Sequence, residues 1–156
     1  MAARTRGLGF APDHVITSPA DRAVATRRVG AYQHLTIVAP GVAEAARPGQ
    51  FVALAVGGPT SANLLRRCFS LHKVSPSGAY GGTLDVVIAA KGPGTQWLAG
   101  LRAHDRVDVV APLGRPFPIP TEPVACVLVG GGYGSAPLFW LADVLRERGC
   151  HVEMVL

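Results

Sequence analysis

A run of five residues, 66–70, combines a cation, an aromatic ring and a hydroxyl within one short segment. The guanidinium of Arg67 can hold a diphosphate through two parallel hydrogen bonds. The ring of Phe69 can pack against a flat cofactor ring, and the hydroxyl of Ser70 can hydrogen-bond to a ring nitrogen. These are the groups with which a strand would hold a flavin. The alternative explanation is a surface arginine beside a core phenylalanine.

A turn with two glycines could also contact phosphate oxygens. It reads Gly92-Pro93-Gly94-Thr95 and opens a predicted helical turn over residues 95–101, with Thr95 as the N-cap. Backbone N–H groups at the start of a helix lack helical partners, and glycine leaves them accessible to a ligand. A capped turn without any ligand explains the same residues equally well.

A second glycine-rich turn lies between an apolar strand and a helix. Its candidate ligand-binding residues are Gly130, Gly131, Gly132 and Gly134. A turn in this position can bind a pyrophosphate at the N-terminus of the helix. The spacing is not the strict G-x-G-x-x-G fingerprint, so a tight turn without a ligand stays open as the alternative.

Short strands must position the first two motifs. Residues 23–39 are rich in β-branched and aromatic residues, which favour strands. The composition predicts individual strands over residues 32–38, 50–56, 67–74, 83–90 and 106–110. Glycine, proline and serine separate them, as expected for strands that are joined by turns and hairpin loops. This part of the chain therefore favours antiparallel β structure.

The pattern changes in the last part of the chain. Residues 124–129 are continuously apolar, as in a parallel strand whose two faces are both buried. Pro137 suits the first turn of a helix, and Gly149 suits its end. Residues 151–156 read as a second strand. Residues 124–156 therefore predict one β-α-β unit.

The overall composition excludes several classes of protein. Apolar residues make up 49% of the chain and charged residues 16%, which is enough apolar material for a folded core. The net charge is +5, but no run of like charges or basic–aromatic stretch indicates nucleic-acid binding. The apolar runs fall short of the ~20 residues that span a bilayer. Cys68, Cys126 and Cys150 have no metal-ligand spacing, and their odd number favours a reducing cytoplasm.

The order of the motifs RRCFS, KGPGT-x-WL, APLG and VLVGGGYGSAPL resembles the ferredoxin-NADP reductase superfamily. Within it, the motifs are most similar to those of the electron-transfer subunits of bacterial NAD-dependent dihydroorotate dehydrogenases. The resemblance covers residues 23–156. It implies a β + α/β fold class, in which a six-stranded antiparallel FAD-binding barrel is followed by the start of a parallel α/β nicotinamide-binding domain.

This resemblance implies four segments. Residues 1–22 are expected to form an N-terminal arm, and residues 23–115 the FAD-binding barrel. The proline-rich residues 116–123 are expected to be a linker. Residues 124–156 are expected to be the first β-α-β unit of an incomplete NAD-binding domain.

The resemblance also implies roles for the motif residues. Arg67 would neutralise the FAD diphosphate, Phe69 would lie against the flavin, and Ser70 would sit near its N5 edge. The phosphate and ribityl contacts would be completed by Gly92, Gly94 and Thr95. The pyrophosphate of NAD(H) would be lined by Gly130, Gly131, Gly132 and Gly134. No catalytic side chain is implied, because hydride passes directly between the two rings while the protein positions them.

The activity implied is that of an FAD-dependent NAD(P)H oxidoreductase component. It would pass electrons between a dihydroorotate dehydrogenase catalytic subunit and NAD in pyrimidine biosynthesis. The subfamily also carries a 2Fe-2S cluster on four cysteines, whose ligands the three cysteines here cannot supply. The family extends well beyond this length, so we expect a truncated chain that would be inactive by itself.

Two departures and two alternatives accompany this interpretation. Cys68 stands where the subfamily usually has proline. Pro93 stands where lysine is common, and Lys91 lies two residues earlier. The chain could instead serve another ferredoxin-reductase-type system, or it could be a catalytically silent domain that docks a partner.

Overall fold

The protein is represented by a computed structural model that describes residues 16–18, 22–58, 60–79 and 81–156. The larger sheet contains β1 (Ile16–Ser18), β2 (Arg22–Val29), β3 (Tyr32–Val38), β4 (Phe51–Leu54), β5 (Arg67–Ser75), β6 (Thr83–Ile88) and β7 (Val109–Leu113). Its order is β1-β7-β4-β5-β6-β3-β2, and every pairing is antiparallel. A second, parallel sheet contains β8 (Ala125–Val129) and β9 (His151–Val155).

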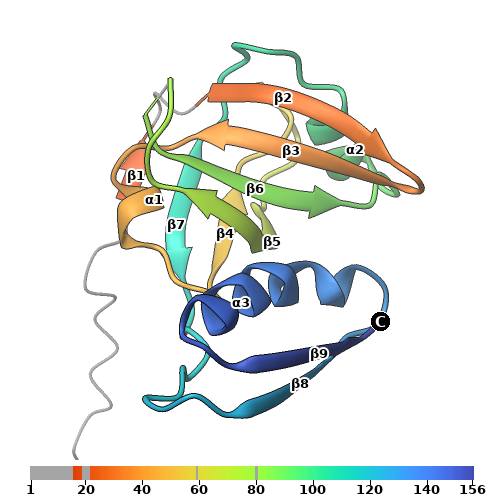
Figure 1. The fold of residues 1–156 in the computed structure, drawn as a ribbon. Helices are drawn as coiled ribbons and strands as arrows, with labels where there is room; N and C mark the ends of the chain where they lie inside the picture. The colour runs from red at the N-terminus through yellow and green to blue at the C-terminus, as the bar shows by residue number, and fades with distance from the viewer. Residues whose placement is uncertain (1–15, 19–21, 59, 80) are drawn as a thin grey trace, which may run out of the picture.

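The larger sheet encloses the main core. Strands β3 and β6 alternate between buried and partly exposed residues, and their buried side chains are Leu35, Ile37, Leu84, Val86 and Ile88. These belong to one cluster with buried residues of β4, β5 and β7. Figure 1 shows that the sheet curls, with β4 and β7 lying behind β6. Burial of one face per strand is what the alternating sequence pattern requires.

Strand β5 belongs to both halves of the curled sheet. Its first residues pair with β4, and its last residues pair with β6. The register shifts between Leu71 and Lys73, so His72 is the extra residue of a β-bulge. A bulge bends its strand and redirects a side chain. Here His72 leaves the alternating pattern and contacts Ala136, which belongs to a smaller unit formed by residues 124–156.

Three α-helices and one 3₁₀-helix lie within the residues that the structure describes. They are α1 (Val42–Ala45), α2 (Pro93–Ala99), η1 (Gly132–Ser135) and α3 (Ala136–Glu147). Figure 1 shows α3 lying between the larger sheet and the β8–β9 pair. Its buried face includes Leu138, Leu141 and Leu145, which form a second core with Cys150 and Val152. None of the helices in the described part of the chain is long and apolar enough to span a membrane.

The end of α3 shows why β9 starts where it does. Gly149 has a φ of 81°, in the left-handed region that favours glycine. The N–H of Gly149 donates to the carbonyl of Arg146, and the N–H of Cys150 donates to the carbonyl of Leu145. This pair of bonds is a Schellman motif, which satisfies carbonyls that a helix end leaves unpaired. The helix therefore ends just before Gly149, as expected from the sequence, and the chain continues into β9.

Two expectations about strands need correction. Within residues 23–39 one strand was expected, over residues 32–38. The segment instead forms a hairpin of β2 and β3, in which Val29 pairs with Tyr32 across a tight turn. The run 124–129 was expected to be buried on both faces, but Val127 is 63% and Val129 72% exposed. Only α3 covers the β8–β9 pair, so one face of this sheet stays open in the described part of the chain.

Three segments differ in detail from their expected roles. Residues 16–18, within the expected arm, form β1 and pair with β7, whereas residues 1–15 and 19–21 lie outside the described residues. The strand expected over residues 106–110 instead runs from Val109 to Leu113. The linker residues 116–123 contain no helix or strand, and Phe117 packs against the second core. The N–H of Phe117 donates to the carbonyl of Pro48, which ties the linker to the larger sheet.

Candidate functional site

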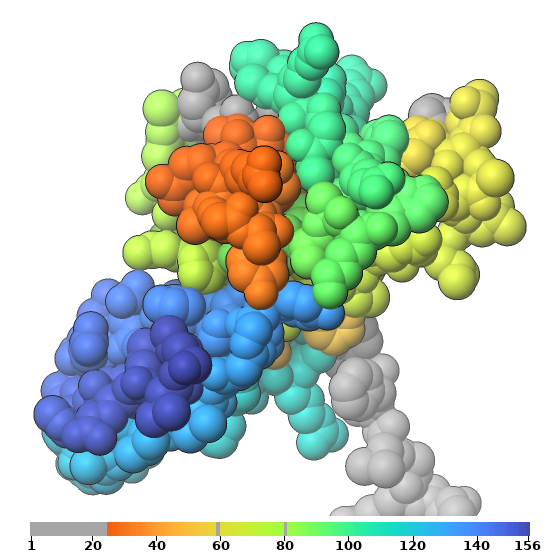
Figure 2. All heavy atoms as spheres, turned by 90° about the vertical axis from the view of Figure 1, so that its right-hand side faces the viewer, coloured from red at the N-terminus to blue at the C-terminus, as the bar shows by residue number. Residues whose placement is uncertain are grey.

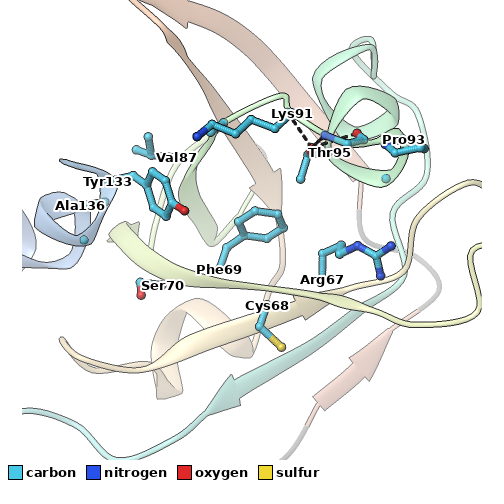
Figure 3. Close-up of a pocket in the computed structure, with 14 residues that line it drawn as sticks. Arg67, Cys68, Phe69, Ser70, Val87, Lys91, Pro93, Thr95, Tyr133 and Ala136 are labelled. Carbon is cyan, nitrogen blue, oxygen red and sulfur yellow. Dashed lines mark hydrogen bonds between the residues drawn. The ribbon is translucent and has the colours of Figure 1, made fainter.

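A cavity of about 500 Å³ lies where β5, the segment before α2, and η1 meet (Figure 3). Seven of the ten candidate residues line it: Arg67, Phe69, Ser70, Gly92, Gly94, Thr95 and Gly134. They come from three segments that are far apart in the sequence. The folded chain thus brings the three motifs to one place. The volume lies in the range of pockets that hold small-molecule ligands.

The two neighbouring arginines at the start of β5 have different surroundings. Arg66 forms an ion pair with Asp108, with 2.6 Å between Nη2 and Oδ2. Arg67 lines the cavity, and its Nη1 donates to the carbonyl of Leu65 at 2.6 Å. Among the described residues, no carboxylate forms an ion pair with Arg67. Arg67 therefore brings a positive charge to the cavity that the protein itself leaves without a salt bridge.

Gly94 allows Arg67 to lie close to the start of α2. A Cβ atom on Gly94 would be 3.0 Å from Val56 Cγ2 and 3.2 Å from Arg67 Nε. Both distances are tighter than ordinary carbon contacts, and Gly94 is buried. The missing side chain therefore lets the guanidinium pack against the helix. This close approach gives a structural reason for glycine at position 94.

The hydroxyl of Thr95 is used differently from the expectation. Thr95 is the third residue of α2, and Gly92 is the N-cap, so the prediction of Thr95 as the N-cap is wrong. The Oγ1 of Thr95 accepts the N–H groups of Lys91 and Gly92 at 3.1 and 3.0 Å, and donates to the carbonyl of Gly92 (Figure 3). A polar side chain at the third position of a helix can reach back to the N–H of the N-cap residue, as in a capping box. Thr95 therefore shapes the turn.

Phe69 lies near the middle of the cavity, between its two ends. Figure 3 shows Arg67 and Pro93 at one end, Tyr133 and Ala136 at the other, and the Phe69 ring between them. Phe69 is partly buried and packs against the main core, which fixes the position of its ring. Ser70 is exposed, and it forms the part of the lining next to the smaller unit. An aromatic surface thus lies between a cationic end and a polar end.

The glycine-rich turn contributes only part of its length to this cavity. Gly134 lines it, whereas Gly130, Gly131 and Gly132 are not among its lining residues. A Cβ atom on Gly130 would be 2.7 Å from Leu138 Cδ1 and 2.9 Å from the Cα of Ser135. Gly130 is therefore needed for close packing of β8 against α3. Gly131 and Gly134 have no neighbouring atom within 4 Å of such a Cβ, so their surroundings are open.

Seven of the fourteen lining residues were not among the site residues predicted from the sequence, and three of these seven have polar or reactive side chains. Tyr133, Lys91 and Cys68 also line the cavity. Tyr133 makes an edge-to-face contact with Tyr32 of β3, with 6.2 Å between ring centroids. Tyr133 stands inside the glycine motif and Cys68 inside the arginine motif, so their places in these motifs were the available signals. The contact with Tyr32 had no signal, because it joins residues about a hundred positions apart.

A histidine pair holds α3 against the larger sheet. Nδ1 of His72 donates to the carbonyl of Ala136 at 2.7 Å, which requires a proton on that nitrogen. The ring of His72 lies edge-to-face against both His34 and Phe139, each with centroids 5.5 Å apart. Burial lowers the pKa of His34, while Asp85 opposes that shift. These contacts set the position of α3, and with it the position of Ala136 in the cavity wall.

The described residues contain no group of three or more histidine, cysteine or acidic side chains that could hold a metal ion. Cys68 is exposed on β5, and Cys126 lies on β8. All three cysteines are free thiols. No step that needs a cluster can be assigned to these residues.

Proteins of similar sequence are electron-transfer subunits of NAD-dependent dihydroorotate dehydrogenase B. The subunit of Desulforamulus reducens is 39% identical over 119 residues, which is 76% of this chain and 44% of the relative. That of Geobacillus thermodenitrificans is 39% identical over 124 residues, 78% of this chain and 47% of the relative. The chain thus spans under half the length of these curated relatives. No protein-family model matches the chain.

Solved structures of reductases share the fold. An NADH-dependent reduced ferredoxin-NADP oxidoreductase superposes with a TM-score of 0.76 and 29% identity, over 89% of this chain and 48% of the other. The cytochrome P450 reductase of Amycolatopsis gives 0.65 and 27%, over 86% and 42%. Phthalate dioxygenase reductase, 19% identical, shares the fold with a TM-score of 0.67, over 91% and 43%. The chain has the FAD- and NAD-binding fold of ferredoxin-NADP reductases, which confirms the predicted fold class.

Proposed function

We propose that this chain binds FAD in the cavity between β5, α2 and η1. The observation that carries the proposal is the convergence of three separate motifs on one cavity. The cationic end formed by Arg67 suits the diphosphate, because guanidinium groups bind phosphates through paired hydrogen bonds. The ring of Phe69 suits the flat flavin, and Ser70 and Gly134 suit its polar edge.

The residues present fit this cofactor in both charge and shape. Arg67 has no salt-bridge partner among the described residues, and Gly94 leaves space that a Cβ would take from Arg67. When bound, FAD supplies the chemistry of accepting and releasing a hydride. Phe69 and the backbone around Ser70 would orient the ring, and Arg67 and the turn held by Thr95 would hold the diphosphate. Tyr133 would cover the ring end of the cavity.

We further propose that the open glycines Gly131 and Gly134, with Gly132, receive the pyrophosphate of NAD(H). Their turn joins a strand to a helix, where backbone N–H groups favour an anion. The relatives support a role as an electron-transfer component that works with a dihydroorotate dehydrogenase catalytic subunit. The likeness to the Amycolatopsis reductase supports a second candidate, a reductase component that serves another redox partner.

The test of FAD binding uses the purified chain and an Arg67→Ala variant. Removing a charge-assisted hydrogen bond costs about 1.5–3 kcal/mol, so FAD affinity should fall by roughly 10- to 150-fold. The affinity is measured by quenching of flavin fluorescence during titration. Arg102→Gln is the matched control, because Arg102 is an exposed arginine that does not line this cavity.

A folded chain that binds no FAD would refute the proposal. An Arg67→Ala variant with unchanged FAD affinity would refute the role of Arg67. To separate the two candidate systems, the FAD-loaded chain is mixed with a dihydroorotate dehydrogenase catalytic subunit and analysed by size-exclusion chromatography. Co-elution supports the first candidate, whereas separate elution favours the second.

A further inference from the structure

The larger sheet and the smaller unit meet at a joint of four rings and one hydrogen bond. Nδ1 of His72 donates to the carbonyl of Ala136, and the His72 ring stands edge-to-face against His34 of β3 and Phe139 of α3. Trp140, the next residue of α3, is partly buried against the main core. Figure 2 shows the blue residues of the smaller unit below the orange and green residues of the larger sheet. We call these five residues the histidine joint.

The larger sheet places a carboxylate beside the histidines, but Nε2 of His34 lies 3.7 Å from Oδ2 of Asp85, which exceeds a hydrogen-bond length. Burial is the largest cause that lowers the pKa of His34, and Asp85 opposes that shift. His72 lowers this pKa further, as does Arg27, which pairs with His34 in the register of β2 and β3. Tyr32, two residues before His34, has a phenol side chain, and phenols gain no charge in acid. Asp85 therefore offsets only part of any positive charge on the histidines.

The start of α3 brings positive rather than negative charge to the joint. Residues 136–142 contain no acidic side chain. Asp143, one turn beyond Phe139, pairs with Lys73 of β5 at 3.4 Å. Ala136 is the first residue of the helix, and a helix N-terminus carries a partial positive charge. The carbonyl of Ala136 can accept a hydrogen bond from a neutral or a protonated His72, but the first two turns of α3 offer no carboxylate to offset a second charge beside it.

We propose that the histidine joint is a pH-sensitive latch, which is closed while at most one of His34 and His72 is protonated and opens when both are. Histidine side chains ordinarily gain their second ring proton below a pH of about 6.5. Two protonated rings would face each other with 5.5 Å between centroids, in a partly buried place where water screens charge less than at the surface. Movement of α3 away from β5 relieves this repulsion and breaks the bond between His72 and Ala136. Because Ala136 lines the cavity, opening changes the cavity wall whether or not a ligand is bound.

The fluorescence of Trp140 tests the latch, because this side chain packs across the joint. The chain has two tryptophans, so Trp97→Phe leaves Trp140 as the single reporter. Acrylamide quenching is measured at pH values of about 7.5 and about 5.5, on either side of histidine titration, and far-UV circular dichroism reports whether the chain stays folded. We expect the quenching constant to rise about twofold at the lower pH with an unchanged dichroism spectrum, because local opening exposes the indole. If Trp97→Phe does not fold, amide hydrogen exchange of residues 136–141 is measured instead, with each variant compared with the unchanged chain at the same pH.

Three variants identify the groups responsible. His72→Asn keeps an N–H donor for Ala136 but cannot titrate, and His34→Gln removes the other titrating ring, so each should abolish the rise in quenching at the lower pH. His151→Gln is the matched control, because His151 is exposed on β9, and it should keep the rise.

Three results would overturn the proposal. The first is equal quenching of Trp140 at both pH values in the unchanged joint. The second is a rise that survives in either His34→Gln or His72→Asn, or that is lost equally in His151→Gln. The third is loss of the dichroism spectrum in parallel with the rise, which would indicate unfolding of the whole chain. None of these measurements needs FAD, so the outcome is independent of the proposed function.

Discussion

Arg66 and Arg67 are neighbours in sequence, but only one of them is neutralised within the protein. Arg66 pairs with Asp108 and also donates to the carbonyl of Asp108 at 2.9 Å, so it fastens the start of β5 to the segment before β7. Arg67 has the same chemistry but faces the cavity. Successive side chains of an extended chain point to opposite sides, which separates the two roles. A charge without a salt bridge to a described carboxylate is the strongest single-residue indication of an anionic ligand here.

Gly94→Ala should destabilise the ligand-free protein, whereas Gly92→Ala should not. The new methyl group at position 94 would press on Val56 and Arg67, and such overpacking costs about 1–3 kcal/mol. Position 92 has open space and a φ of −118°, which alanine adopts readily. Urea unfolding of both variants without FAD measures the difference. Equal stability of the two variants would contradict the packing argument at Gly94.

The lowered pKa of His34 makes a prediction about acid sensitivity. Burial is the main cause, so the folded protein holds this proton more weakly than the unfolded chain does. Arg27 and His72 act in the same direction, whereas Asp85 opposes them. The unfolded chain therefore gains protons first as the pH falls below the ordinary value of 6.5. The free energy of unfolding should be largest above that pH and should decrease below it.

Urea unfolding at pH values of about 7.5 and about 5.5 tests this prediction, because histidine titrates between them. The His34→Gln variant should lose less stability over this interval than the unchanged protein. His104→Asn is the control, since His104 is exposed and Asn tolerates its positive φ of 73°. An unchanged pH dependence in His34→Gln would show that His34 is not responsible.

Strand β5 is the element that organises the site. Its first half carries the cavity residues, its bulge turns His72 toward α3, and Lys73 pairs with Asp143 of α3 at 3.4 Å. This ion pair is exposed, so its contribution to stability is small. The bond between His72 and Ala136 is partly buried and fixes the start of α3. One strand thus forms one wall of the cavity and positions the wall opposite to it.

The glycine-rich turn has a packing role at one position and an open backbone at another. Gly130→Ala would place a methyl group 2.7 Å from Leu138 Cδ1, so it should lower the free energy of unfolding by about 1–3 kcal/mol. Gly131→Ala has open space and a φ of −120° and should leave stability unchanged. Urea unfolding and amide hydrogen exchange of α3 measure the effect. Faster exchange in α3 for Gly131→Ala than for Gly130→Ala would contradict this assignment.

At the scale of the whole molecule, the candidate site joins two units with separate cores. The larger sheet supplies most of the cavity, and Tyr133, Gly134 and Ala136 of the smaller unit close one end of it. A ligand in this position would contact both units. Ligand binding would therefore stabilise the contact between the units as well as each unit separately.

FAD should slow amide hydrogen exchange in both units. At a free concentration of about 100 times its Kd, a ligand that binds only the folded state adds about 2.7 kcal/mol of stability. We expect protection in β5 and also in η1 and the first turn of α3. The measurement is hydrogen exchange by mass spectrometry, with and without FAD. Protection confined to the larger sheet would show that the smaller unit takes no part in binding.

The open face of the β8–β9 pair is a further property of the whole molecule. Val127, Val129 and Val155 are all more than half exposed on it. The continuous apolar run suited burial on two sides, but α3 covers only one side in the described part of the chain. Sequence patterns report which faces are apolar. What covers a face depends on where other elements lie.

Much of the local structure could be predicted from residue types. Composition gave the positions of β3, β5 and β6, and Pro137 and Gly149 marked the limits of α3 closely. The β2–β3 turn at Gly30 and Ala31 was missed because its flanking strands share one composition. The N-cap of α2 was predicted at Thr95 but lies at Gly92. A threonine hydroxyl can hydrogen-bond to backbone groups at a helix start either from the N-cap position or from inside the first turn. Local rules fail where two local arrangements satisfy the same groups.

By itself, the sequence determined the fold class and the three motifs. Only the tertiary structure decided that Arg67 lies without a salt bridge beside Gly94 and that Gly130 serves packing. The structure also decided that Lys91 and Tyr133 line the cavity. Periodicity and turn chemistry act between residues close in sequence. Neutralisation of a charge and the shape of a cavity depend on strands and turns that meet only after the chain has folded.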